Sequence, residues 1–418
     1  MAEYYTCHRL MVCSTILALS SIVAVSWSQS LTWLGVPDGC TASYAWDVSA
    51  DGSVVVGSAE CSGQYRAFRW TASTGMQNLG VLDGGYWSMA YGVSQDGSIV
   101  VGRANQLDFI TFVDYTHGFR WTESERMVIL GGFTGTFTTA SDVSADGTVV
   151  VGWSNFNSPH NRAFRWTTDG VTQLGTLGGN NNRAYAVSAD GSVIVGEAQD
   201  SSGYERAFRW SQEGGMQSLG TLGGNRSAAR AISSDGSVVV GWSYNADNKM
   251  RAFRWTTGTN MQDLGTLSGY DSSGANAVSA GGSVVVGWAT NSSGYLAPFI
   301  WTESEGMRNL NTVYADLLNG SVIAEARAIS PDGRYIVGYG YNAATSRVEA
   351  FLLDTLPNCT QHSGDVVVDG CVDDADLLAV LFAFGNSGNN LGRVDVNCDQ
   401  MVDDADLLIV LFNFGSGC

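Results

Sequence analysis

The amino-acid sequence predicts an all-β fold, a seven-bladed β-propeller closed by an N-terminal strand, followed by a small α-helical module. Three observations lead to this prediction. A unit recurs seven times between residues 45 and 351, a fragment at the front of the chain matches a piece that the last unit lacks, and the composition changes after Pro357. We therefore expect a signal peptide over residues 1–28, a propeller over residues 31–357 and a separate module over residues 358–418.

The start of the chain has the features of a secretory signal. An apolar run over residues 10–25 follows His8 and Arg9, and small residues at Ser26 and Ser28 offer cleavage sites. The run is too short for a typical membrane-spanning helix, so we expect export to the cell surface or the medium. A retained membrane anchor is the alternative. No later segment is long and apolar enough to span a bilayer.

Each repeat resolves into four strand-like segments. A small apolar segment meets a valine-rich segment across an Asp-Gly turn, as in AWDVSADGSVVVG, and segments such as RAFRW and MQDLGTL follow. Asp-Gly supplies the positive φ of tight hairpins, and four short strands per unit are typical of a propeller blade. The turn residues recur every 44 to 51 positions, a propeller-like period; they are Asp51, Asp96, Asp146, Asp190, Asp235, Gly281 and Asp332.

The front fragment predicts how the ring closes. The seventh repeat has its first three segments but no fourth, whereas residues 31–35, LTWLG, resemble that fourth segment. We expect Leu31 to Gly35 to pair with the strand around residues 350–353, which would leave no unpaired blade edge. An open solenoid is the alternative, but it would not need a front fragment that matches a piece missing at the back.

The repeats resemble a known family. The RAFRW and HGFRW segments, the Asp-Gly hairpins and the LGTLGG endings resemble the bacterial extracellular HAF-repeat family, from Leu31 to about Leu356. This resemblance implies a secreted repeat protein whose biochemical role in that family is mostly not established. The strand order also resembles that of WD-repeat propellers, which implies that the first strand of each unit lines the central channel.

One position varies among otherwise similar copies. The alanine before it and the serine three residues after it are identical in all seven copies, which packing and turn chemistry explain. By the WD-repeat analogy the variable side chains ring the channel, and their aromatic, amide and guanidinium groups suit a sugar. We therefore predict an extracellular ligand, with a polysaccharide as candidate; the alternative is that they only fill the channel mouth. They are Trp46, Tyr91, Ser141, Tyr185, Arg230, Asn276 and Arg327.

The loops between second and third strands are a second candidate surface, because binding residues often lie on loops of a rigid scaffold. The alternative is that the tryptophans after the VVG segments pack under the rim. The aromatic and histidine residues expected in these loops are Trp153, Phe156, His160, Tyr204, Trp242, Tyr244, Trp288 and Tyr295.

No catalytic constellation stands out among the four histidines, and the repeated aspartate is typical of a turn. Asp47 and Asp142 near the channel are a candidate carboxylate pair for glycosidase chemistry. We predict a non-enzymatic binding or scaffold protein; the alternatives are a polysaccharide-degrading enzyme and a purely structural cell-envelope protein. The net charge of −19 argues against nucleic acid and anionic membranes as partners, and we expect a monomer.

The segment after Pro357 is duplicated, as DVVVDGCVDDADLLAVLFAFG and DVNCDQMVDDADLLIVLFNFG. Acidic residues alternate at the start of each copy, as in calcium-binding EF-hand loops, and an apolar helix follows. The pair resembles a type I dockerin, which implies Ca²⁺ and a cohesin-like or cell-surface partner. The candidate calcium ligands are Asp365, Asp369, Asp373 and Asp376 in the first loop and Asp395, Asn397, Asp399, Asp403 and Asp406 in the second.

Both loops depart from the dockerin motif. Val367 replaces an oxygen ligand in the first loop, and Gln400 replaces the turn glycine in the second. We therefore expect the second loop to bind calcium more strongly. The alternatives are an acidic helical tail without metal and a calcium-stabilised module without a cohesin partner.

An even number of cysteines remains after removal of the signal, which in an oxidising compartment suggests disulfides. We predict the pairs Cys40–Cys61, Cys371–Cys398 and Cys359–Cys418. The four tail cysteines allow three connectivities, and the sequence alone does not decide among them.

Overall fold

The computed structural model describes residues 29–355, 364–367, 371–387, 391, 394–396 and 401–416. The chain divides into two compact units, one spanning Gln29–Pro357 and one that contains Asn358–Cys418. The predicted signal peptide lies outside the described residues. Within the described ranges, no helix has the length and apolar character needed to cross a membrane.

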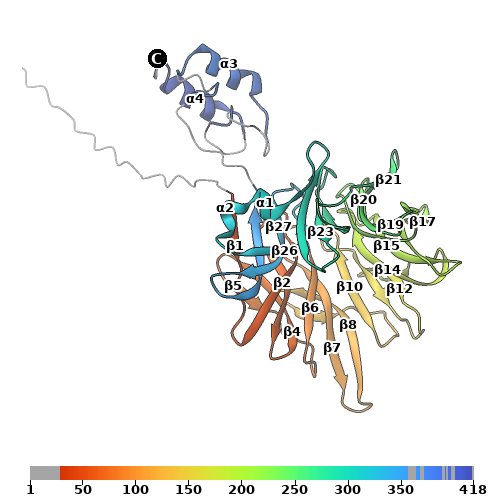
Figure 1. Cartoon of the computed structure of the whole chain (residues 1–418). Coiled ribbons are helices and arrows are strands. Elements are labelled where there is room, and N and C mark those ends of the chain that lie inside the picture. The colour runs from red at the N-terminus through yellow and green to blue at the C-terminus, as the bar shows by residue number, and fades with distance from the viewer. Residues whose placement is uncertain are drawn as a thin grey trace, which may run out of the picture. The chain divides into compact units, whose positions relative to one another are not determined.

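Seven antiparallel sheets of four strands each form a β-propeller (Figure 1). In blades 1 to 6 the order of strands in the sheet is their order in the chain. Blade 1 contains β2 (Cys40–Val48), β3 (Val55–Cys61), β4 (Gln64–Thr71) and β5 (Gly75–Asn78); blade 2 contains β6 (Ser88–Val93), β7 (Val100–Asp108), β8 (Val113–Thr122) and β9 (Arg126–Ile129); blade 3 contains β10 (Thr138–Val143), β11 (Val150–Ser154), β12 (Arg162–Thr167) and β13 (Gly170–Gln173). Blade 4 contains β14 (Gly178–Val187), β15 (Val193–Asp200), β16 (Glu205–Ser211) and β17 (Gly215–Ser218); blade 5 contains β18 (Gly223–Ile232), β19 (Val239–Asn245), β20 (Met250–Thr256) and β21 (Asn260–Asp263); blade 6 contains β22 (Ser272–Val278), β23 (Val284–Thr290), β24 (Leu296–Thr302) and β25 (Gly306–Asn309).

The N-terminal strand completes the seventh blade, so the predicted closure is confirmed. This blade has the order β1 (Ser30–Trp33), β28 (Arg347–Asp354), β27 (Tyr335–Asn342) and β26 (Val322–Ile329). Leu31 is paired with Leu353, and the backbone N–H of Leu34 donates to the carbonyl of Ala350 at 2.9 Å. Ser43 of blade 1 accepts a hydrogen bond from the N–H of Ala350, as equivalent serines do between other blades.

Each blade packs around one phenylalanine of its third strand. The glycine of the preceding VVG segment permits this contact: at Gly57 a Cβ would lie 2.1 Å from the carbonyl oxygen of Tyr44 and 2.7 Å from the ring of Phe68. Valines of the same segment, such as Val56, pack against the next blade. All seven phenylalanines are fully buried; they are Phe68, Phe119, Phe164, Phe208, Phe253, Phe299 and Phe351.

The repeated serine and aspartate build the turn between the first two strands, as the sequence predicts. In blade 4 the Ser188 hydroxyl donates to Asp190 at 2.6 Å and accepts from the N–H of Val193 at 3.0 Å, while Gly191 has a φ of +72°. The hydrogen bond from Ser188 holds the pKa of Asp190 below its usual value. These aspartates are therefore turn residues rather than members of a site.

Two short helices interrupt the all-strand pattern expected between blades 6 and 7. They are α1 (Leu310–Val313) and α2 (Ala315–Leu318). The side chain of Asn309 caps α1 by accepting from the N–H of Asn311 at 2.9 Å. Leu310, Tyr314 and Leu318 are spaced by four residues, and all three are buried in one cluster. The connection between blades 6 and 7 is therefore a pair of short packed helices, where the sequence predicts a loop.

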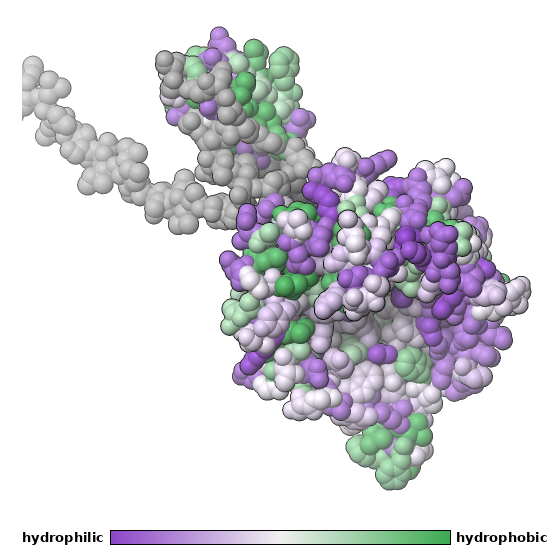
Figure 2. Space-filling view, viewed as in Figure 1, coloured by the Kyte–Doolittle hydropathy of each residue, from purple (hydrophilic) through white to green (hydrophobic). Residues whose placement is uncertain are grey.

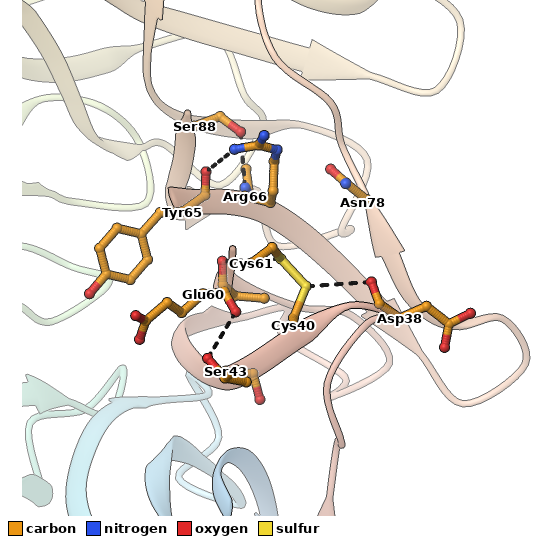
Figure 3. Close-up of a disulfide and its surroundings, with 12 residues drawn as sticks. Asp38, Cys40, Ser43, Glu60, Cys61, Tyr65, Arg66, Asn78 and Ser88 are labelled. Carbon is orange, nitrogen blue, oxygen red and sulfur yellow. Dashed lines mark hydrogen bonds between the residues drawn. A yellow bond between two sulfur atoms is a disulfide. The ribbon is translucent and has the colours of Figure 1, made fainter. Parts of the chain in front are cut away.

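The predicted disulfide between Cys40 and Cys61 is confirmed. It joins the first residue of β2 to the last residue of β3, which are paired in the sheet (Figure 3). Cys371 is also disulfide-bonded. Because Cys359, Cys398 and Cys418 lie outside the described residues, the pairing in the tail stays a prediction.

The C-terminal unit contains two related halves. Helices α3 (Asp374–Ala383) and α4 (Asp404–Phe412) each begin with an aspartate capping box. The N–H of Gly385 donates to the carbonyl of Val402, and the N–H of Gly415 donates to that of Val372. The sequence duplication is therefore a structural duplication with a valine core, made of Val366, Val372, Val380, Val396, Val402 and Val410.

Candidate functional site

One cavity gathers all seven residues of the variable position. It has a volume of about 530 Å³ and lies where the first strands of the blades meet around the channel. Its lining consists of Trp46, Tyr91, Ser141, Tyr185, Arg230, Asn276 and Arg327, together with Arg103, Thr139, Trp153, Trp242, Trp288 and Glu325.

A β-bulge in each first strand explains why the variable side chains meet here. In blade 1 the pairing with β3 shifts between Ala45 and Asp47, so Trp46 has no partner residue on the second strand. The same shift occurs at the equivalent residue of every blade. Bulges redirect side chains and are often found beside functional sites. The variable position after the repeated alanine is therefore the residue of the first strand that has no partner on the second strand.

Three tryptophans that follow VVG segments form part of the cavity wall, but the prediction that they lie in loops is wrong. Trp153, Trp242 and Trp288 lie on β11, β19 and β23, because strand pairing continues past the VVG segment. The loop prediction is also wrong for Tyr244, which lies on β19, whereas Phe156, His160, Tyr204 and Tyr295 lie between strands; none of these five residues is in the cavity lining.

The cavity arginines stack on aromatic rings. The guanidinium carbon of Arg327 lies 3.6 Å from the ring centroid of Trp46, and that of Arg230 lies 4.3 Å from the ring centroid of Tyr185. Arg103 lies over Tyr91 at 5.6 Å. Such contacts hold a cation in place without a carboxylate partner.

Two carboxylates bind side chains of the cavity lining, and one of them, Glu325, itself lines the cavity. Glu325 accepts from Arg327 at 3.0 Å and from the Asn276 amide at 2.9 Å. Glu197 accepts from the Tyr185 hydroxyl at 2.7 Å and from Arg183 at 2.7 Å. Burial, with the nearby charge of Glu197, raises the pKa of Tyr185 to about 12, so this phenol is a neutral donor at pH 7.

The charge of the cavity is opposite to that of the whole protein. Three arginines and one glutamate line it, a formal charge of +2, whereas the chain carries −19. Among the described residues, Arg103 and Arg230 have no carboxylate within ion-pair distance.

The carboxylates of Asp47 and Asp142 lie elsewhere, in a cavity of about 140 Å³ that shares no lining residue with the first. Asp47 accepts from the N–H groups of Val48 and of Val93 in the next blade, at 2.8 and 2.9 Å, and Asp142 makes the equivalent bonds between blades 3 and 4. Burial, reinforced by the charge of Asp142, raises the pKa of Asp47 to about 8. We therefore assign both aspartates a role in joining blades.

The described part of the tail does not by itself fit a calcium site. Among the described residues, no three acidic, histidine or cysteine side chains form a group that could hold a metal ion. Asp376 instead accepts from the N–H groups of Val367 and Asp373, at 2.8 and 2.9 Å, and Asp406 accepts from that of Asp403. Calcium binding stays a prediction that depends on ligands outside the described residues, namely Asp369, Asn397 and Asp399.

Sequence reasoning missed an exposed apolar hairpin tip between β7 and β8. Phe109, Ile110 and Phe112 are 66%, 90% and 80% exposed, and Figure 2 shows the tip as a green projection at the bottom of the view. The signal was present in the longer second repeat with its FITFV segment. Arg103 of the cavity was missed too, although it occupies the same repeat position as the three tryptophans.

Neither a protein-family model nor a curated protein matches the sequence. Among solved structures, an oligogalacturonate lyase from Vibrio parahaemolyticus is similar with a TM-score of 0.52 and 12% identity, over 79% of this chain and 96% of that one. The β-propeller domain of a trilobed protease from Pyrococcus furiosus is similar with a TM-score of 0.50 and 9% identity, over 79% and 96%. TolB from Acinetobacter baumannii has a TM-score of 0.42 and 14% identity, and the match covers 66% of this chain and 65% of TolB. At these identities the likeness shows the propeller fold alone. The resemblances to HAF repeats and dockerins stay predictions.

Proposed function

We propose that this protein is an exported, non-enzymatic binding protein whose propeller holds an extracellular carbohydrate in the central cavity. One observation carries the proposal: the bulge position, which varies from blade to blade, places aromatic rings and hydrogen-bonding groups in a single cavity. Aromatic faces such as Trp153 and Trp242 suit the apolar faces of sugar rings, and Asn276 and Ser141 suit sugar hydroxyls. The disulfide between Cys40 and Cys61 supports export, because disulfides persist in oxidising compartments.

A glycan array with the full chain, followed by tryptophan fluorescence titration, tests this proposal. Four of the tryptophans line the cavity and none lies after Trp301, so the signal reports on the propeller and not on the tail. Trp153→Ala and Trp242→Ala should weaken binding about tenfold, as loss of an aromatic platform does. Tyr204→Ala, an exposed aromatic outside the cavity, is the control and should bind as the parent does.

Two results would contradict the proposal. The first is the absence of any retained glycan, which would favour a structural envelope protein. The second is release of reducing sugar from a bound polysaccharide, which would favour the enzyme alternative.

For the tail we propose attachment to a protein partner of the cohesin type. Each half of the tail presents apolar side chains, on its helix and just after it, that are 46% to 87% exposed: Leu378, Leu381, Phe382 and Phe384 in the first half and Leu408, Leu411, Phe412 and Phe414 in the second. Binding of the full chain to a panel of cohesin modules should be weakened in the double variant Phe382→Ser, Phe412→Ser. Retention by no cohesin would reject this partner and favour the stand-alone module.

A further inference from the structure

The cavity contains polar groups that none of the described residues satisfies. Among the described residues, six buried side-chain nitrogen or oxygen atoms have no hydrogen-bond partner, and three of these belong to residues of the cavity lining. They are Nε of Arg103, Oγ1 of Thr139 and Nη1 of Arg327. A buried donor without a partner is unfavourable, so their concentration at one cavity indicates that a ligand supplies the missing acceptors.

The three groups also define the chemistry of that ligand. Guanidinium groups donate hydrogen bonds and cannot accept them, and the Thr139 hydroxyl can donate as well. The ligand must therefore present acceptor oxygens. Thr139 is fully buried, so bulk water does not satisfy its hydroxyl, and a ligand oxygen reaches it only when neighbouring side chains of the cavity wall shift slightly.

Stacking fixes the guanidinium of Arg230, but no described carboxylate neutralises its charge. It stacks on Tyr185, and in the described structure it makes no hydrogen bond or ion pair. By contrast, Arg327 is paired with Glu325 and Arg183 is paired with Glu197. A planar guanidinium that is fixed by stacking and left without a carboxylate suits the carboxylate of a ligand, which it can bind through two parallel hydrogen bonds.

The cavity also continues outward. A neighbouring cavity of about 550 Å³ shares Trp153, Tyr185 and Arg230 with the first and adds Arg183 and Asn161. A ligand longer than one sugar ring can therefore extend from the channel over blades 3 and 4. The net charge of −19 weakens long-range attraction of an anionic ligand, whereas the local charge of +2 favours acidic groups that enter the cavity.

We propose that the ligand is an acidic oligosaccharide of the uronic acid class, with a sugar carboxylate bound by Arg230 and sugar oxygens bound by Thr139, Arg103 and Arg327. This inference rests on the proposed function and adds to it the chemical class of the sugar. The sugar rings pack on the faces of the cavity tryptophans, and Arg230 favours an acidic sugar over a neutral one by binding its carboxylate.

Matched sugars test the proposal with the full chain. Oligomers of β-1,4-linked glucuronic acid and of β-1,4-linked glucose differ only in the carboxylate that replaces the C6 hydroxymethyl group. We expect the glucuronic acid oligomer to bind at least about tenfold more tightly, and this preference to weaken as salt is added. In Arg230→Gln the preference should fall to about twofold or less, with the affinity for the glucose oligomer unchanged.

Two further variants separate recognition from folding. Blade 6 has Asn276 at the position of Arg230, so the fold accepts a neutral amide there. Arg226→Gln, on the same strand but outside both cavities and paired with Glu205, should keep the preference. Thr139→Val removes an unsatisfied hydroxyl at constant shape, so it should weaken sugar binding while leaving the melting temperature equal or higher.

The outcomes distinguish this inference from the proposed function. Equal or tighter binding of the neutral oligomer would overturn the acidic ligand and leave a carbohydrate-binding protein. Tighter binding of a sulfated glucose oligomer than of the glucuronic acid oligomer would overturn the carboxylate. Binding of no sugar at all would reject both proposals.

Discussion

Asp47 and Asp142, which line the smaller second cavity, make the stability of the propeller depend on pH. Burial raises the pKa of Asp47 to about 8 and that of Asp142 to about 6, against ordinary values near 3.8. Between about pH 4 and pH 8 the unfolded chain ionises these carboxyls, while the folded protein keeps them protonated for longer. A raised carboxyl pKa therefore favours the folded state at low pH, and that advantage is lost as the pH rises.

The size of the effect follows from the shift. The rise in the pKa of Asp47 from 3.8 to about 8 sets a ceiling on the order of 5 kcal/mol for this contribution, at about 1.36 kcal/mol per pKa unit. Asp47 lines a water-accessible cavity and is only half-buried by accessible surface. We therefore expect a smaller loss, on the order of 2 kcal/mol, between pH 5 and pH 8.5.

The perturbation is Asp47→Ala, and the assay is urea unfolding followed by tryptophan fluorescence at a series of pH values. The fold accepts alanine here, since blades 4 to 7 carry Ala186, Ala231, Ala277 and Ala328 at the equivalent position. The variant should lose most of the decline in unfolding free energy between pH 5 and pH 8.5. Asp169→Ala, in an exposed turn, should retain the decline of the parent. A parent whose stability is flat or rises over this range would refute the reasoning.

Three further predictions concern the closure, the turns and the tail. Deletion of residues 29–36 should expose the edge of β28 and lower the free energy of unfolding by several kcal/mol, on the order of two buried side chains. An unchanged melting temperature would show that β1 does not close the ring. Gly281→Asp should restore the turn hydrogen bonds that the six other blades make and raise the free energy of unfolding by about 1 kcal/mol. Gly287→Ala should be strongly destabilising, because its Cβ would lie 2.1 Å from a carbonyl oxygen. Melting temperatures equal to that of the parent would contradict both expectations. Calcium titration of the full chain, followed by circular dichroism, should show ordering that EDTA reverses. Asp395→Ala should reduce this ordering more than Asp365→Ala does. A spectrum that does not change with calcium would reject the calcium module.

The fold was predictable because each repeat carries its own turn and packing signals. Ser188, Asp190 and Gly191 determine a turn that needs no partner from elsewhere in the chain, and counting the segments was enough to place Leu31 beside Leu353. The helices α1 and α2 were missed because they replace a loop in a single copy. A repeat pattern gives no expectation for a segment that departs from it.

The candidate site was predictable in part. Comparison of the copies identified the positions of Trp46 and Arg230, since a position that varies against a constant scaffold is not required for packing. The place of Trp153 was predicted wrongly because the sequence does not mark where strand pairing ends. Thr139 could not be found at all: only the folded structure shows that its hydroxyl is buried without a partner.

The cavity and the closure depend on one another. Arg327 of blade 7 stacks on Trp46 of blade 1 at 3.6 Å, and these two blades are adjacent only because the ring closes. The strand that carries Arg327 belongs to the same sheet as β1, so loss of β1 weakens the support of that contact. A chain that lacks residues 29–36 and stays folded should therefore bind the glucuronic acid oligomer more weakly, although none of the deleted residues lines the cavity. Unchanged affinity in such a chain would show that the contact between Arg327 and Trp46 forms without closure by the N-terminal strand.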